Sequence, residues 1–169
     1  TGAKIPLSTS ILHNLSGVDI DDNGTIDLFV NSDTTNDRSL GMFYNSGTSA
    51  GFTYLNQTNV FLDNGQHDYG NLLMSMTYAD FNQDGWLDLY INRGAKAGVN
   101  SNESRIYLND GKGQLLATDS QAKWFGDSDA GGTSFAVDWN FDGKMDVIEL
   151  PLQATGTVTA AMTFNPKLY

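Results

Sequence analysis

The chain has 169 residues, of which 40% are hydrophobic, and this is enough to bury a core within one domain. Its formal charge of −11 disfavours binding to nucleic acid or to an anionic membrane. The absence of cysteine excludes disulfides, thiolate zinc sites and cysteine nucleophiles. Because the chain begins at Thr1 and carries neither a signal peptide nor an apolar run of about 18 residues, we interpret it as part of a longer protein without predicted membrane insertion.

Short β-strands are predicted along the whole chain, in three repeats of four strands each. The segments are rich in β-branched and aromatic residues, and Gly, Asn, Asp and Ser fill the turns between them. The predicted strands are 16–18, 27–30, 41–45 and 51–55; 76–79, 88–91, 105–109 and 113–116; and 134–137, 146–150, 158–165 and a shortened 168–169. The fold class is therefore all-β, with three four-stranded antiparallel blades of a β-propeller at about 8–56, 72–118 and 131–169.

An acidic loop of nine residues joins the first two strands of each repeat. The loops begin at Asp19, Asp80 and Asp138, about 60 residues apart. Side-chain oxygens stand at positions 1, 3, 5 and 9, a main-chain carbonyl is available at position 7, and glycine at position 6 permits a sharp turn, which is the donor pattern of a calcium loop. The predicted ligands are Asp19, Asp21, Asn23, Thr25 and Asp27; Asp80, Asn82, Asp84, Trp86 and Asp88; and Asp138, Asn140, Asp142, Lys144 and Asp146. About three calcium ions are expected, one in each loop.

The third loop also fits the spacing of an EF-hand, because Glu149 stands at its position 12. The equivalent residues of the other loops are Val30 and Ile91, which cannot bind calcium through their side chains. An EF-hand also requires a helix after the loop, whereas the segment here is β-branched and ends at Pro151. We therefore interpret Glu149 as a strand residue.

Two other interpretations of the loops are acidic turns without an ion and a catalytic metal site. Carboxylates crowded into a short turn repel one another unless a cation is present, which disfavours the first. A catalytic metal needs an open coordination position and a substrate pocket, and the loops offer only oxygen ligands, which favours structural calcium. A weaker candidate metal site is the polar segment with Asp63, His67 and Asp68, while His13 has no nearby motif.

The motif at residues 78–91 and the turn at residues 108–113 resemble the FG-GAP and VCBS repeat family. The resemblance extends over residues 16–165 and implies four-stranded blades around an axis, with structural calcium in each loop. The Phe-Gly and Gly-Ala-Pro signatures of the family are missing, which favours its bacterial surface-protein branch. Closed propellers usually need four to eight blades, so three blades imply a partial propeller or fragment, completed by further blades or by self-association.

The expected function is that of a non-enzymatic calcium-binding module of a bacterial surface or secreted protein, serving adhesion, protein interaction or spacing. Extracellular calcium is abundant enough to fill loops of this type. One alternative is a glycan-binding propeller that uses Trp124 and the polar connections, whereas Trp86 and Trp139 are expected to pack within the blades. Another is an accessory region of a secreted toxin or hydrolase. The expected partner is an unknown protein or glycan.

Overall fold

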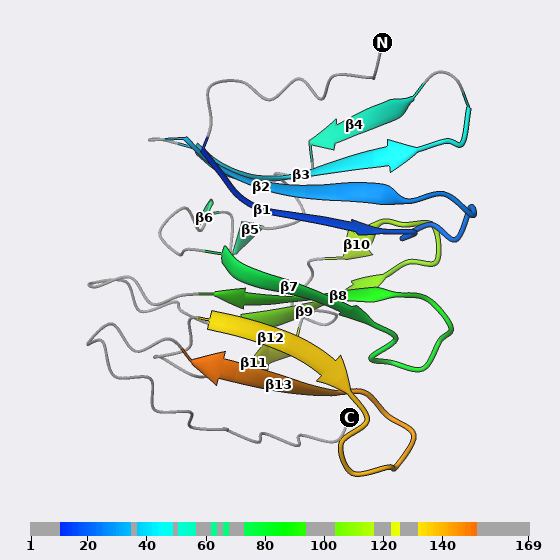
Figure 1. Cartoon of the computed structure of the whole chain (residues 1–169), viewed down its shortest axis with the longest axis vertical. Coiled ribbons are helices and arrows are strands. Elements are labelled where there is room, and N and C mark those ends of the chain that lie inside the picture. Colours follow the sequence, from blue (N-terminus) through cyan, green and yellow to red (C-terminus); the bar gives the residue numbers. More distant parts are fainter. Residues whose placement is uncertain are drawn as a thin grey trace. The chain divides into compact units, whose positions relative to one another are not determined.

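The computed structural model describes the strands and loops that surround the three acidic segments (Figure 1). The described residues are 11–34, 37–48, 51–56, 62–63, 66–67, 73–93, 104–116, 123–125 and 132–151. All regular secondary structure in these ranges is β and pairs in antiparallel sheets, as predicted. The chain divides into two compact units, Thr1–Tyr69 and Gly70–Tyr169.

The first unit contains a four-stranded antiparallel meander, here called repeat 1. Its strands are β1 (Ile11–Val18), β2 (Asp27–Thr34), β3 (Asp37–Asn45) and β4 (Phe52–Asn56), paired in the order β1-β2-β3-β4. The four predicted strands of this repeat are thus present. Phe29 and Phe43 are almost completely buried and form part of its core. A short hairpin of β5 (Leu62–Asp63) and β6 (Gln66–His67) lies in the segment predicted to be a loop.

The second unit begins with a larger sheet, here called repeat 2. Its strands are β7 (Leu73–Ala79), β8 (Asp88–Arg93), β9 (Ser104–Asn109), β10 (Leu115–Leu116) and β11 (Lys123–Phe125). β10 and β11 both pair antiparallel with β9, β10 at one end and β11 at the other. The predicted fourth strand at 113–116 is thus present as the shorter β10, and β11 was not predicted. Trp124, predicted to lie in the connection before the third repeat, lies in β11 opposite Arg105.

Repeat 3 is the hairpin of β12 (Gly132–Val137) and β13 (Asp146–Pro151). The strands predicted at 158–165 and 168–169 lie outside the described residues. Glu149 is in β13 and pairs with Ser134, as the prediction of a strand residue required. The described strands do not form a closed propeller, and none of the described residues lies in a helix long and apolar enough to cross a membrane.

Within the second unit, β12 of repeat 3 packs against β7 of repeat 2. Ser134 joins the two strands: its hydroxyl lies 2.7 Å from the Ser75 hydroxyl and 2.9 Å from the Thr77 hydroxyl, and Thr77 also donates to the Ser134 carbonyl at 2.9 Å. All three side chains are buried. Since β7 and β12 belong to different sheets, this contact between side chains holds two successive repeats together.

Candidate metal-binding loops

The first aspartate of each loop turns its carboxylate inward and fixes the backbone of the turn. Asp19 accepts hydrogen bonds from the N–H groups of Asn23 (3.0 Å) and Gly24 (2.8 Å). The same two bonds recur at Asp80 and Asp138, with N–O distances between 2.8 and 3.0 Å. The glycine at position 6 has a positive φ in all three loops, 84°, 92° and 85°, which explains why this residue recurs.

The last aspartate of each loop lies where the second strand begins and is more deeply buried in loops 1 and 2. Asp27 and Asp88 are 1% and 0% exposed. Asp88 accepts hydrogen bonds from the N–H of Phe81 (2.9 Å) and of Asn109 in β9 (2.8 Å), and Asp27 makes the corresponding bonds. In loop 3, Asp146 accepts from the N–H of Trp139 at 3.1 Å. This carboxylate thus closes the loop and, in repeats 1 and 2, also ties it to the third strand.

The asparagine that ends the third strand supports the loop, a role that was not predicted. The Asn109 side chain donates to the carbonyl of Leu87 at 3.0 Å and accepts from the N–H of Gly111 at 3.0 Å. Asn45 makes equivalent bonds to Ile26 and Gly47, at 3.3 and 3.1 Å. The recurrence of Asn followed two residues later by Gly was the sequence signal for this role.

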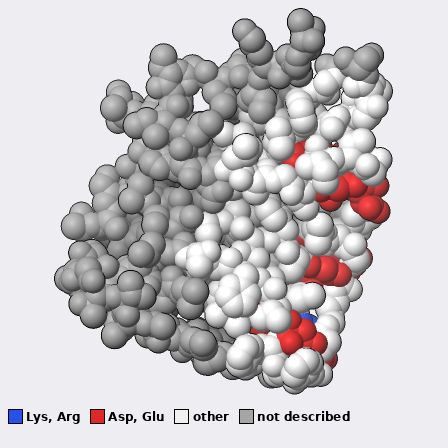
Figure 2. Space-filling model, in the orientation of Figure 1, with Lys and Arg blue, Asp and Glu red and all other residues white. Residues whose placement is uncertain are grey.

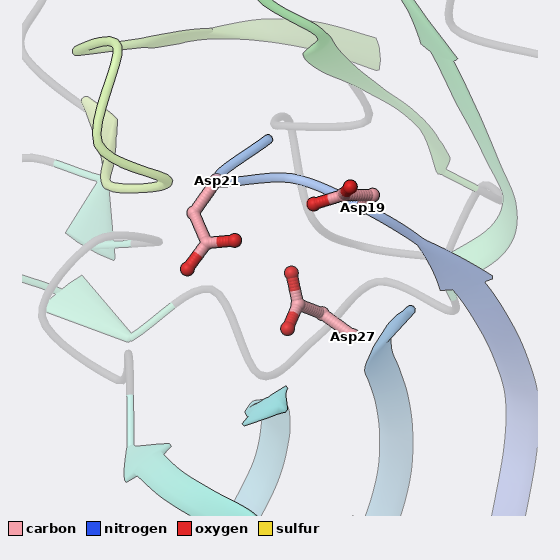
Figure 3. A group of neighbouring side chains, drawn as sticks. All are labelled: Asp19, Asp21 and Asp27. Carbon is pink, nitrogen blue, oxygen red and sulfur yellow. The ribbon is translucent and has the colours of Figure 1, made fainter. Parts of the chain in front are cut away.

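In loop 1, three carboxylates converge on one point (Figure 3). Asp19, Asp21 and Asp27 each offer an oxygen, and these oxygens lie within 4.8 Å of one another. The Oδ1 atom of Asp21 is buried and has no hydrogen-bond partner. A buried carboxylate oxygen without a donor is unfavourable unless a cation compensates it. The donor set, all oxygen and strongly negative, fits a hard divalent cation such as calcium.

Loops 2 and 3 have the same number of carboxylates as loop 1 at the predicted ligand positions, but in a different order. Position 3 is Asn82 or Asn140 and position 5 is an aspartate, whereas loop 1 has Asp21 followed by Asn23. The Asn82 amide donates to Asp84 at 2.7 Å, and Asn140 donates to Asp142 at 3.1 Å. In these two loops an internal amide therefore provides a donor for the position-5 carboxylate.

In loop 1 the corresponding amide points elsewhere. Asn23 donates through Nδ2 to the carbonyl of Asn45 in β3, at 2.9 Å, and the Thr25 hydroxyl donates to the same carbonyl. This interaction fastens loop 1 to the third strand, and it leaves Asp21 Oδ1 without a donor. Among the described loops, loop 1 is therefore the one with a buried carboxylate oxygen that lacks a hydrogen-bond donor, which a bound cation would compensate.

Burial makes the charged forms of Asp27 and Asp88 unfavourable. It raises the pKa of Asp88 to about 6, although the hydrogen bonds from Asn109 and Phe81 oppose the shift. The pKa of Asp27 is also raised by burial. In Figure 2 the acidic side chains on the visible face form compact groups, while most of the described surface around them is uncharged. A bound divalent ion would favour the charged form of both residues.

The tryptophans of the loops differ in their surroundings. The Trp86 indole lies against Gly111, where an added Cβ would come within 2.9 Å of its nitrogen, in agreement with the predicted packing role. Trp139 was also expected to pack but is 53% exposed, whereas Ile20, at the same loop position, is 1% exposed. The candidate site at Asp63, His67 and Asp68 falls on side chains outside the described ones.

Residues 95–148 match the FG-GAP-like repeat family. The match runs from the second half of repeat 2 through loop 3 and into β13, so it includes β12 but not β7, the strand of repeat 2 on which β12 packs. No curated protein and no solved structure matches the chain.

Proposed function

Because residues 95–148 form an FG-GAP-like repeat, we propose that the chain is a non-enzymatic, calcium-stabilised repeat module of a secreted or surface-exposed bacterial protein, serving protein interaction, adhesion or spacing. The observation that carries the proposal is the convergence of Asp19, Asp21 and Asp27 around a buried Asp21 oxygen that has no donor. FG-GAP repeats often bind calcium, and the oxygen donors of this loop suit that ion.

Calcium would be held in loop 1 by the three carboxylates, with Asn23 and the Thr25 carbonyl completing the donor set. The second and third loops are proposed as further sites because their first and last aspartates make the same hydrogen bonds to the backbone. In each repeat the ion would neutralise carboxylates at the corner between the first two strands. Its effect would be structural, since the corner sets the register of the hairpin that follows.

An extracellular location is proposed because the loops offer only oxygen ligands and are expected to bind calcium weakly. Weak oxygen-only calcium sites are filled at the millimolar concentrations found outside cells and are largely empty in the cytosol. Outside the cell the ions would hold the repeats folded, leaving the polar connections between strands to contact a protein or glycan partner.

The test is thermal unfolding of the full chain in calcium, in magnesium and after chelation. Calcium in about 100-fold excess over its dissociation constant should stabilise the fold by about 2.7 kcal/mol for each site filled. The melting temperature should rise in calcium and respond less to magnesium, which requires a smaller, octahedral site. An unchanged melting temperature in calcium would refute the proposal.

A pair of neighbouring substitutions locates the effect in loop 1. Asp21→Asn removes a converging carboxylate, so the calcium-induced rise in melting temperature should shrink. Asp22→Asn removes the same charge from an exposed residue whose φ is 53°, a conformation that asparagine tolerates well. The matched Asp22→Asn variant should respond to calcium like the unmodified chain, and equal losses in both variants would assign the effect to general charge.

A further inference from the structure

The contact between repeats 2 and 3 provides a template for a second contact of the same kind. In repeat 2 the face that carries Ser75 and Thr77 is covered by Ser134 of repeat 3. A second bond strengthens this contact, because the Gln83 side chain in loop 2 donates to the carbonyl of Gly143 in loop 3 at 2.8 Å. One face of a repeat, together with position 4 of its loop, thus receives the next repeat.

The equivalent face of repeat 3 is exposed. Counted from the first aspartate of the loop, Thr133 and Phe135 take the places of Ser75 and Thr77, and Phe141 takes the place of Gln83. Alternate residues of a strand point to opposite sides, so Thr133 and Phe135 face away from β7 when Ser134 faces it. Thr133 is exposed, Phe135 is 45% exposed and Phe141 is 91% exposed. This surface, here called the outer face of repeat 3, is where a further repeat would fit.

Repeat 1 exposes the complementary residues. Leu15 and Gly17 stand four and two residues before the first aspartate of their loop, the places held by Ser134 and Ala136 in repeat 3. Leu15 is 58% exposed, and Gly17 is exposed as well. The two residues face the same side of β1, because they lie two residues apart in its regularly paired part. Repeat 1 therefore presents, uncovered, the side of its first strand with which repeat 3 docks on repeat 2.

Both exposed faces are more apolar than the internal contact between repeats 2 and 3. The internal contact pairs hydroxyl groups, Thr77 and Ser75 with Ser134, whereas the exposed faces present Phe135 and Leu15. Seven large apolar side chains are exposed among the described residues. Four of them belong to repeat 3, namely Phe135, Trp139, Phe141 and Met145, and two belong to repeat 1, namely Leu15 and Ile26. Contiguous exposed apolar surface is typical of protein contacts.

We propose that the outer face of repeat 3 docks on the β1 face of repeat 1 in a second copy of this chain. Phe135 packs against Leu15 of the second copy. Phe141 lies over loop 1 of that second copy, as Gln83 lies over loop 3 within one chain. The contact is heterologous, because it joins two different surfaces.

Sedimentation velocity of the full chain in calcium-containing buffer, supplemented by single-face variants, tests this proposal. The unmodified chain should sediment as a dimer, while Phe135→Lys and Leu15→Lys should each sediment as monomers. Lysine reduces the net negative charge, so added repulsion between copies cannot explain a loss of association. The matched control, Leu87→Lys, changes an apolar residue of loop 2 that is 36% exposed and outside both faces, and it should remain dimeric.

Mixing the two variants distinguishes a heterologous contact from a symmetric one. The Phe135→Lys chain keeps its Leu15 face and the Leu15→Lys chain keeps its Phe135 face, so an equimolar mixture should regain dimers through one intact contact. A dimeric Leu15→Lys chain by itself would overturn the proposal, as would an unmodified chain that stays monomeric. If a lysine variant loses its circular dichroism spectrum, Phe135→Thr and Leu15→Ser, which introduce the residues of the internal contact, replace it and should weaken association at least tenfold.

Discussion

The first and second loops share one backbone frame but treat their middle carboxylate differently. In both, the first aspartate accepts two N–H groups of the turn and the last aspartate holds the start of the loop and the third strand. In loop 2 the Asn82 amide donates to Asp84, whereas in loop 1 the Asn23 amide donates to β3 and Asp21 Oδ1 has no donor. The order of Asp and Asn at positions 3 and 5 thus distinguishes loop 2, in which an amide of the loop donates to a loop carboxylate, from loop 1, in which Asp21 Oδ1 has no donor.

This difference separates two roles of the loop carboxylates: organising the backbone of the turn and binding a cation. The carboxylates at positions 1 and 9 organise the protein backbone, because they accept hydrogen bonds from main-chain N–H groups of the turn and of the start of the loop. The carboxylates at positions 3 and 5 vary in order between loops, and we expect this order to determine how strongly a loop depends on a cation. The predictions that follow test this separation.

The largest loss of stability is expected at the last aspartate of a loop, which makes the same hydrogen bonds in loops 1 and 2. Asp88→Ala leaves the buried N–H groups of Phe81 and Asn109 without their acceptor. At about 1–3 kcal/mol for each unsatisfied group, the free energy of unfolding should fall by about 4 kcal/mol. Urea unfolding of the metal-free protein measures this loss. The control is Asp84→Ala, which removes an exposed carboxylate of the same loop; an equal loss there would contradict the proposed division of roles.

The pH dependence of stability should change sign with calcium. Since burial raises the pKa of Asp88 to about 6 from its usual 3.8, the metal-free folded chain keeps this proton to a higher pH than the unfolded chain. Asp88 therefore stabilises the metal-free fold below about pH 4, and this contribution, at most about 3 kcal/mol, is lost as the pH rises through about 6. Bound calcium favours the carboxylate, so with calcium the fold should instead lose stability as the pH falls.

Melting temperatures between about pH 4 and pH 7, with and without calcium, measure both slopes. The Asp88→Asn variant cannot titrate at this position, so its metal-free slope should be flatter than that of the unmodified chain. A variant slope equal to that of the unmodified chain would assign the pH dependence to other carboxylates.

A smaller effect is expected from interconverting the two loop types. Asp21→Asn removes the buried charge without a donor, so the metal-free fold should gain about 1 kcal/mol of stability. Asn82→Asp makes the reverse change: it replaces the amide that donates to Asp84 with a second carboxylate, and should lower metal-free stability by a similar amount. Urea unfolding after chelation measures both. Changes of the same sign in the two variants would show that the order of Asp and Asn does not matter.

The strands and the loop frame could be predicted because their signals are local. A glycine at position 6 and aspartates at positions 1 and 9 recur in each loop, and the alternation of β-branched and aromatic residues marks the strands beside them. The different orientations of Asn23 and Asn82 could not be predicted, since the order of Asp and Asn at positions 3 and 5 does not show that the Asn45 carbonyl in β3 lies within reach of Asn23.

Other features depend on distant contacts and were missed for that reason. β11 is short and separated from β10 by the polar segment 117–122, so its pairing with β9, which includes Trp124 in the sheet, has no local signal. The support of the loops by Asn45 and Asn109 requires the third strand to lie beside the loop. The exposure of Trp139 likewise depends on what packs against it, which its own sequence neighbourhood does not specify.

The smallest effect is expected at the bond that connects loop 2 with loop 3. Gln83 has a φ of 61°, and this conformation, fixed by loop 2, aims its amide at the Gly143 carbonyl. The next peptide N–H, of Lys144, donates to Asp142 at 2.8 Å, so the bond reaches a predicted ligand of loop 3. Gln83→Asn keeps the amide and tolerates the positive φ but is one methylene too short, and should reduce the free energy of unfolding by about 0.5–1 kcal/mol.

The same variant tests whether the two loops act together. If a cation in loop 2 orders Gln83, and Gln83 orders loop 3, then Gln83→Asn should reduce the cooperativity of calcium binding measured by calorimetric titration, while leaving the number of ions unchanged. Gln114→Asn, the same change at an exposed residue of repeat 2, is the control and should not alter cooperativity. Undiminished cooperativity in Gln83→Asn would mean that the repeats communicate through the packing of β7 on β12 instead, and Thr77→Val would then be the substitution that uncouples them.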